Sequence, residues 1–148
     1  MSKIVQALLV GMLVTFILDF FLFLGIFVNY TNPLEINLYY NVLFADNQNI
    51  FLYALFTLLF GYLVMYTKSV VSVSVISFFS LLALLSLLSP IGNFLGEAMF
   101  KKEDVHLKTP KFSYHGDILY RGRTKVTFYD YKFKKILNLE KKNLQGLN

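Results

Sequence analysis

Asp19 is the residue whose type and position most suggest chemistry. It is the only ionisable side chain in the apolar run 4–28, and as the sixteenth of 25 positions it is expected near the bilayer midplane. An ionised carboxylate at that depth costs roughly 2.5–3.5 kcal/mol on insertion scales, so such residues are by default functional candidates. Lys3 and Lys68 flank the apolar runs and offer no partner at depth.

Three interpretations of Asp19 are open. The carboxylate forms a salt bridge with a cationic residue of another subunit, or it is protonated and hydrogen bonded to a hydroxyl within the helical bundle. The third interpretation is an ion or proton relay. A relay normally uses a second ionisable group at depth, and the apolar runs contain none.

A second group of side chains has the chemistry of metal ligands. Its two histidines are nine residues apart across a predicted turn at Pro110, and no pair has the i, i+4 spacing of a helical zinc motif. We therefore expect a solvated strand face, with no metal and no cofactor. The group consists of Glu103, Asp104, His106, His115 and Asp117.

Motifs of known catalytic chemistry are missing from the sequence. There is no cysteine, no Gly-rich phosphate loop, no Gly-x-Ser-x-Gly and no His-Glu-x-x-His. A membrane-bound enzyme that uses His106 or His115 is the least favoured hypothesis. The sequence predicts a protein that is not an enzyme and has no catalytic residues.

The elements that must position these residues are those of a membrane protein. Hydrophobic residues make up 56% of the chain, charged residues 16%, and the mean hydropathy is +0.56, which excludes a disordered chain. The apolar runs 4–28, 49–66 and 69–89 predict three transmembrane helices, and the first is too long for a cleaved signal peptide. The expected fold class is membrane α-helical with a small β appendage.

Two segments of mixed polarity are expected at the membrane interface. One lies near 34–45, where Tyr39 and Tyr40 suit the headgroup level. The other lies near 90–100, where Ser89-Pro90 starts a short amphipathic helix. Together with the three spans they form the first predicted domain, residues 1–100.

Small and polar residues form stripes along the predicted helices. Residues four apart share a helix face, and small side chains let membrane helices approach closely. Either the stripes close the three-helix bundle, or at least one faces another protein. The stripes are Ala7, Gly11, Thr15 and Asp19 in the first span, Asn49, Tyr53, Thr57 and Gly61 in the second, and Ser69, Ser72, Ser77, Ser80 and Ala83 in the third.

Residues 101–148 form the second predicted domain, a basic, aromatic and β-rich tail. It carries twelve basic side chains against five acidic ones, whereas residues 1–100 carry two against four. Alternating polarity from Lys111 onward predicts an antiparallel β-hairpin, which a third strand at 136–140 extends to a meander, with 141–148 frayed. The expected partners of the charge are anionic lipid headgroups or an acidic protein surface, and not nucleic acid.

A two-residue turn at Gly122-Arg123 sets the expected hairpin register. In this register Gly116 faces Tyr129 and Tyr114 faces Tyr131, so that the aromatic side chains share one face. Because two or three strands are marginally stable alone, this face, with Tyr114, Tyr129 and Tyr131, is expected to bind a partner.

Charge near the spans sets the expected topology. The loop 29–48 has no Lys or Arg, which favours a cytoplasmic N-terminus and a tail on the outer side of the plasma (inner) membrane. Lys101, Lys102, Lys108 and Lys111 favour the opposite, but the rule is weakest for charges spread through a folded segment.

These features predict a non-enzymatic accessory subunit or assembly factor of a larger integral membrane protein complex. It would dock through the small-residue stripes and the β tail onto other integral membrane subunits. The alternative is a small homo-oligomeric proton-coupled transporter or channel that uses a ring of Asp19 side chains.

Overall fold

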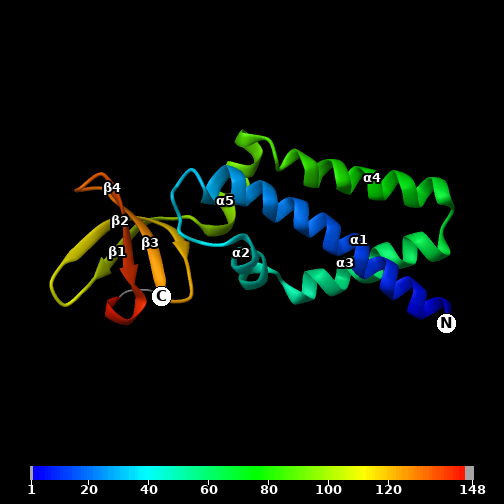
Figure 1. Ribbon diagram of the computed structural model, residues 1–148, viewed down its shortest axis with the longest axis horizontal. Helices are drawn as coiled ribbons and strands as arrows, with labels where there is room; N and C mark the ends of the chain where they lie inside the picture. Colours follow the sequence, from blue (N-terminus) through cyan, green and yellow to red (C-terminus); the bar gives the residue numbers. More distant parts are fainter. Residues whose placement is uncertain (1, 146–148) are drawn as a thin grey trace.

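The computed structural model describes residues 2–145 and shows an elongated molecule with helices at one end and a β-sheet at the other (Figure 1). The N-terminus lies at the far end of the helices, and the C-terminus lies on the sheet. The helices are α1 (Lys3–Ile26), continued by a π-helical turn η1 (Phe27–Thr31), α2 (Tyr40–Asn47), α3 (Ile50–Tyr66), α4 (Ser69–Leu85), α5 (Ser89–Phe100) and a short 3₁₀ turn η2 (Lys141–Asn143). The strands are β1 (Lys102–Lys108), β2 (Ser113–Arg121), β3 (Lys125–Asp130) and β4 (Lys135–Glu140).

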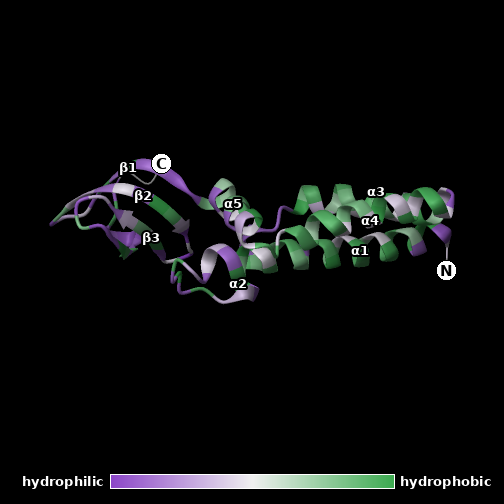
Figure 2. Ribbon diagram, turned by 90° about the horizontal axis from the view of Figure 1, so that it is seen from above, coloured by the Kyte–Doolittle hydropathy of each residue, from purple (hydrophilic) through white to green (hydrophobic). Residues whose placement is uncertain are grey.

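One helix among residues 2–145, the continuous Lys3–Thr31, is both long and apolar enough to cross a membrane. Two more crossings arise only if each bent pair is counted as a single span: α2 with α3, which meet at 85°, and α4 with α5, which meet at 89°. Figure 2 shows apolar residues along α1, α3 and α4 and more hydrophilic residues in the sheet. Helices with a small β appendage are thus confirmed, with one helix of membrane-crossing length.

Both bends follow from local sequence. The Asn49 side chain caps α3 by accepting hydrogen bonds from the Phe51 and Leu52 amides, which stops α2 from continuing into it. Pro90 occupies the first turn of α5, where its missing N–H has no cost. The predicted interfacial segments near 34–45 and 90–100 therefore contain two separate short helices.

The helices α1 and α3 pack with their backbones in contact. A Cβ atom on Gly11 would lie 1.9 Å from the Thr57 carbonyl oxygen, and one on Gly61 would lie 2.3 Å from the Ala7 carbonyl oxygen. Tyr53 also donates a hydrogen bond to the Met12 carbonyl at 3.0 Å. At these positions the small-residue stripes of the first two spans face each other and close a helix pair within the chain.

The sheet has four antiparallel strands in the order β1-β2-β3-β4, two more than a hairpin. The predicted third strand at 136–140 is present as β4, and β1 is an additional strand within 101–108 that the sequence analysis did not identify. Residues 141–145 are ordered, because Lys108 and Gln145 form a β-bridge, whereas 146–148 of the segment predicted to fray lie outside the described residues.

The predicted hairpin register is wrong by one residue. Gly116 pairs with Asp130 rather than Tyr129, and a bulge between Ile118 and Tyr120 shifts the register again. The physical reason is that Arg121 pairs with Val126, so the connection is longer than the two-residue turn that was expected. A slip of one residue exchanges the two faces of a strand.

The corrected register separates the three tyrosines that were predicted to share one face. Tyr114 packs on the face of the sheet that carries Phe128, which we call the inner face. The centres of the Tyr114 and Phe128 rings are 6.4 Å apart. Tyr129 and Tyr131 lie on the opposite face, with their rings 6.3 Å apart. The inner face has its own core, formed by the buried side chains of Leu107, Ile118, Val126 and Phe128.

The sheet is supported by the helices of its own chain. Tyr30, at the end of α1, donates a buried hydrogen bond of 2.8 Å to the Leu119 carbonyl of β2. Arg123 forms an ion pair with Asp46 of α2. A shared apolar core fills the junction, formed by the buried side chains of Phe23, Ile26, Tyr30, Ile36, Leu43, Leu119 and Tyr120.

We expect Gly61→Ala to destabilise the helix pair by about 1–3 kcal/mol, because the new methyl group meets the Ala7 backbone. Thermal unfolding in mild detergent measures the effect. Ala54→Leu, at an exposed position of α3, is the control and should leave the midpoint nearly unchanged. An equal midpoint for Gly61→Ala and wild type would contradict the close backbone contact.

Tyr30→Phe is expected to loosen the sheet from the helices. It removes the hydrogen bond to the Leu119 carbonyl and leaves that buried acceptor unpaired, at a cost of about 1–3 kcal/mol. Limited proteolysis should then cut the sheet faster in the variant. Tyr39→Phe, at a side chain that is 79% exposed, should not change the cleavage rate.

Candidate functional site

The position of Asp19 along the helices follows from how α1, α3 and α4 align. The stretch from Lys3 to Asp19 has 17 residues, as have α3 and α4. The three stretches share one end, where the Lys3 ammonium lies 4.8 Å from the Tyr66 ring centre. At about 1.5 Å per residue each rises about 25 Å, so Asp19 is level with the start of α3 and the end of α4.

Asp19 therefore lies level with the ends of α3 and α4, although it is near the middle of the continuous helix Lys3–Thr31. Exposed large apolar side chains of α1 run from Ile4 to Ile17, and the next one is Val28. In between, Phe23 and Ile26 are buried in the core shared with the sheet.

A layer of hydrogen bonds lies at the level of Asp19, and we call it the polar layer. Each donor comes from a break between helices or from α2, and each acceptor belongs to α1. The Asp19 side chain therefore accepts a hydrogen bond from an amide group of its own chain. The partner is Gln48, rather than the hydroxyl or the cation that the sequence suggested. The bonds are Gln48 Nε2 to Asp19 Oδ2 (3.0 Å), the Tyr40 hydroxyl to the Phe20 carbonyl (2.9 Å) and Ser86 Oγ to the Phe21 carbonyl (3.1 Å).

A cavity of about 430 Å³ lies next to the polar layer, between α1, α3, α4 and α5; we call it the Asp19 cavity. Leu82 on its rim is 45% exposed, so the cavity reaches the surface. Its wall is apolar apart from two α1 residues. The lining residues are Thr15, Leu18, Asp19, Leu22, Phe56, Phe60, Phe79, Leu82, Ala83, Leu85, Ile91 and Leu95.

Thr15 lines the Asp19 cavity but does not expose its hydroxyl there. The residue is 1% exposed, and its buried Oγ1 has no hydrogen-bond partner among the described residues. A buried hydroxyl without a partner costs about 1–3 kcal/mol. Asp19 uses Oδ2 for Gln48, and a carboxylate accepts several hydrogen bonds, so its carboxylate is the lining group that can accept from a further donor.

The structure divides the residues predicted to bind partners among different environments. Ala7, Gly11, Tyr53, Thr57 and Gly61 meet in the α1–α3 contact, whereas Thr15 and Asp19 line the Asp19 cavity. Of the tail residues, Tyr114 packs in the sheet core and Tyr129 packs against the core shared with the helices. The hydroxyl of Tyr131 donates to the Asp117 carboxylate.

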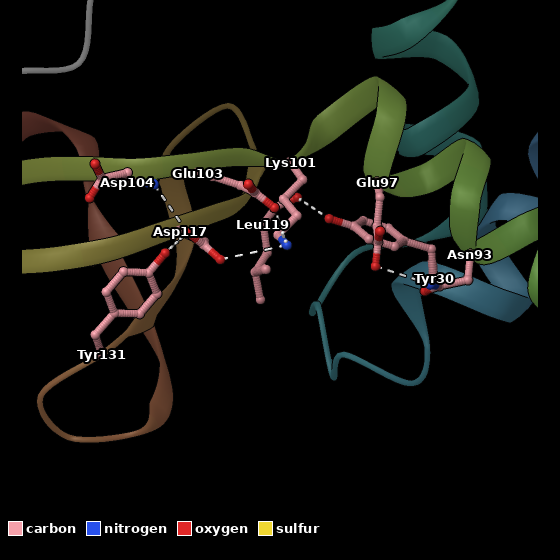
Figure 3. A network of polar contacts seen from close by, with 9 residues as sticks. All are labelled: Tyr30, Asn93, Glu97, Lys101, Glu103, Asp104, Asp117, Leu119 and Tyr131. Atoms are coloured by element: carbon pink, nitrogen blue, oxygen red, sulfur yellow. Dashed lines mark hydrogen bonds and ion pairs between the residues drawn. The ribbon is translucent and has the colours of Figure 1, made fainter.

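Asp117 is the centre of a polar network on the sheet that the sequence did not single out from its neighbours (Figure 3). Its Oδ1 accepts hydrogen bonds from the Asp104 amide at 3.1 Å and from the Tyr131 hydroxyl. Lys101, at the end of α5, lies 3.6 Å from its Oδ2 and also pairs with Glu103 at 2.8 Å. This network joins the sheet to the last helix.

His106 and His115 are close in the structure, although their separation in sequence argued against it. They face each other across β1 and β2, and Asp104 lies beside them. The sequence predicted a solvated strand face without β1. The pairing of β1 with β2, which was not predicted, brings the two histidines together. Within residues 2–145, Asp104, His106 and His115 are the residues that could together hold a metal ion.

Comparison with known proteins identifies no relative for this chain. No family model, curated protein or solved structure matches it. The function is therefore argued from the Asp19 cavity, the polar layer and the sheet themselves.

Proposed function

We propose that this chain is a non-enzymatic accessory subunit or assembly factor of a larger integral membrane protein complex. The observation that carries the proposal is the Asp19 cavity, which reaches the surface and has the Asp19 carboxyl group in an otherwise apolar wall. Intramembrane polar groups are usually paired, and hydrogen bonds between helices help membrane proteins to associate. A site with free acceptors in an apolar wall is suited to binding another membrane protein.

The occupant that fits best is a transmembrane helix of a partner subunit that carries a hydrogen-bond donor or a cation near its end. Its apolar side chains would pack on Phe56, Phe60 and Phe79, and its donor would reach the Asp19 carboxyl group. A lipid acyl chain would fill the same apolar wall but offer no donor to Asp19. The partner helix therefore satisfies more of the site.

The arrangement that we propose in the membrane has three spans. They are α1 up to Asp19, α3 and α4, each about 25 Å long and so close to the roughly 30 Å hydrocarbon thickness. The bends of 85° and 89° support this arrangement, because they turn α2 and α5 away from the α3 and α4 axes and toward the plane of the interface.

We place the N-terminus in the cytoplasm and the sheet on the outer side of the plasma (inner) membrane. Lys3 and the turn at Lys68 lie at one end of the helices, and the lysine-free loop 29–48 lies at the other end with the sheet. A reporter fused to the C-terminus is therefore expected to be active only outside the cytoplasm.

The basic sheet supports contact with anionic lipid headgroups beside the partner. Four basic side chains surround a depression of about 520 Å³, next to the turn that Arg123 ties to α2. Glu140 also lines the depression, and Arg123 and Lys142 are paired with Asp46 and Glu140. Each charge not already paired favours anionic lipids near the interface by about 1 kcal/mol. The residues are Arg123, Lys125, Lys141 and Lys142.

The transporter alternative has less support from this geometry. Its ring of Asp19 side chains would need the carboxylate within the apolar layer, whereas Asp19 is level with the helix ends and is hydrogen bonded to Gln48. The α1 residues before Asp19, α3 and α4 carry no other acidic group and no histidine. A symmetric homo-oligomer with pH-dependent flux in vesicles would favour this alternative.

We expect Asp19→Leu to reduce co-purification of partner subunits in mild detergent. A hydrogen bond between membrane helices contributes about 0.6–1.7 kcal/mol, which predicts a roughly three- to twentyfold loss measured by quantitative mass spectrometry. Gln6→Leu, at an exposed position on α1, is the control and should not change the yield.

Two outcomes would contradict the proposal. One is a clean monomer that carries only lipid and whose deletion affects no membrane complex. The other is a partner whose yield is the same with Asp19→Leu and wild type, which would remove the Asp19 cavity as the contact.

A further inference from the structure

Three side chains that can bind a metal ion lie at the β1 edge of the sheet, far from the Asp19 cavity. Antiparallel pairing of β1 and β2 places His106 directly opposite His115. Their imidazole rings are stacked, with centres 4.1 Å apart and planes inclined by 7°. His115 Nε2 also lies 2.5 Å from Asp104 Oδ1. One ligand atom from each of the three residues lies within 4.8 Å of the other two.

Asp104 is held in this position by an unusual backbone. It lies in the bulge between Lys102 and Val105, and its φ of 54° is in the left-handed region that favours glycine. Its amide donates to Asp117 Oδ1, which also accepts from Tyr131 (Figure 3). Strained residues of this kind occur mostly at functional sites, where the surroundings hold them.

The chemistry of the three groups points to a transition metal ion. Imidazole nitrogens prefer zinc, copper, nickel and iron, whereas calcium and magnesium prefer sites built from oxygen alone. The Asp104 carboxyl group adds an oxygen ligand, which zinc also accepts. Three of the five acidic residues of the basic tail gather here: Glu103, Asp104 and Asp117.

We propose that Asp104, His106 and His115 bind a divalent transition metal ion, with Zn²⁺ as its representative, on the exposed face of β1 and β2. With metal–ligand distances of about 2.0–2.1 Å, neighbouring ligand atoms in a tetrahedral site are about 3.3 Å apart. The ion takes the place of the hydrogen bond between Asp104 and His115, and rotation of the exposed His106 side chain brings in the third ligand.

Three protein ligands leave the fourth position of a tetrahedral site open. Since all three side chains are exposed, water or a donor group of another protein can fill that position. Binding would fasten the edge strand β1 to β2. Asp117 acts as a positioning residue in this site, because it holds the Asp104 backbone without itself being a ligand.

The test is Zn²⁺ binding to the purified full chain, without a histidine tag, after treatment with a chelator. Equilibrium dialysis and calorimetry are expected to give one Zn²⁺ per chain, and no binding of Mg²⁺. Replacement by Co²⁺ should give visible absorption bands typical of tetrahedral coordination. His106→Gln and His115→Gln should each weaken Zn²⁺ binding at least tenfold, and the double variant should abolish it.

Further variants separate the site from nonspecific binding. Asp117→Asn is expected to weaken Zn²⁺ binding about ten- to a hundredfold while leaving the cobalt spectrum tetrahedral. Glu140→Gln, which removes an exposed acid paired with Lys142, is the control and should bind as wild type does. Circular dichroism without metal should be the same for wild type, the histidine variants and Glu140→Gln, because these side chains are exposed.

Substoichiometric Zn²⁺ binding, or full binding by the double histidine variant, would overturn the proposal. Neither result depends on whether the Asp19 cavity binds a partner, because the two sites lie on different parts of the molecule (Figure 1).

Discussion

The rest of the molecule depends on the contact between the backbones of α1 and α3. Gly11 and Gly61 allow the helices to touch, and this sets which residues face each other along the pair. Once Gly11 lies against Thr57, Asp19 comes level with Gln48, and their hydrogen bond follows from that alignment. The polar layer and the cavity beside it are therefore consequences of the close packing of α1 and α3 around Gly11 and Gly61.

The helix α1 also connects the two halves of the chain. Its first part presents large apolar side chains on the surface, and its last turns are buried against the sheet, where Tyr30 reaches the Leu119 carbonyl. The small sheet has a core of its own on one face and uses the helices on the other. Two or three strands are marginal in isolation, and this chain adds a fourth strand and a helical support.

The parts of the fold that were predictable are those controlled by neighbours in sequence. The break between the apolar runs 49–66 and 69–89, the new helix at Ser89-Pro90 and the strand at 136–140 follow from local composition and are present. The hairpin register was wrong, because it depends on a bulge between Ile118 and Tyr120 and on a longer turn. Which residues lie level with Asp19 could not be predicted, because this depends on the alignment of α1 with α3. Of the candidate sites, Asp19 was visible as an isolated charge, whereas the cluster at Asp104 required the unpredicted strand β1.

By itself the sequence determined the apolar helices, the small-residue stripes and a basic β-rich tail, because periodicity and charge act over a few residues. The tertiary structure alone decided which stripes meet, where Asp19 lies and that His106 faces His115. These results depend on contacts between distant segments, such as the Ala7 carbonyl against Gly61, and a shift of one residue in a strand reverses them. No local pattern contains that information, since it is set by how closely two backbones can approach.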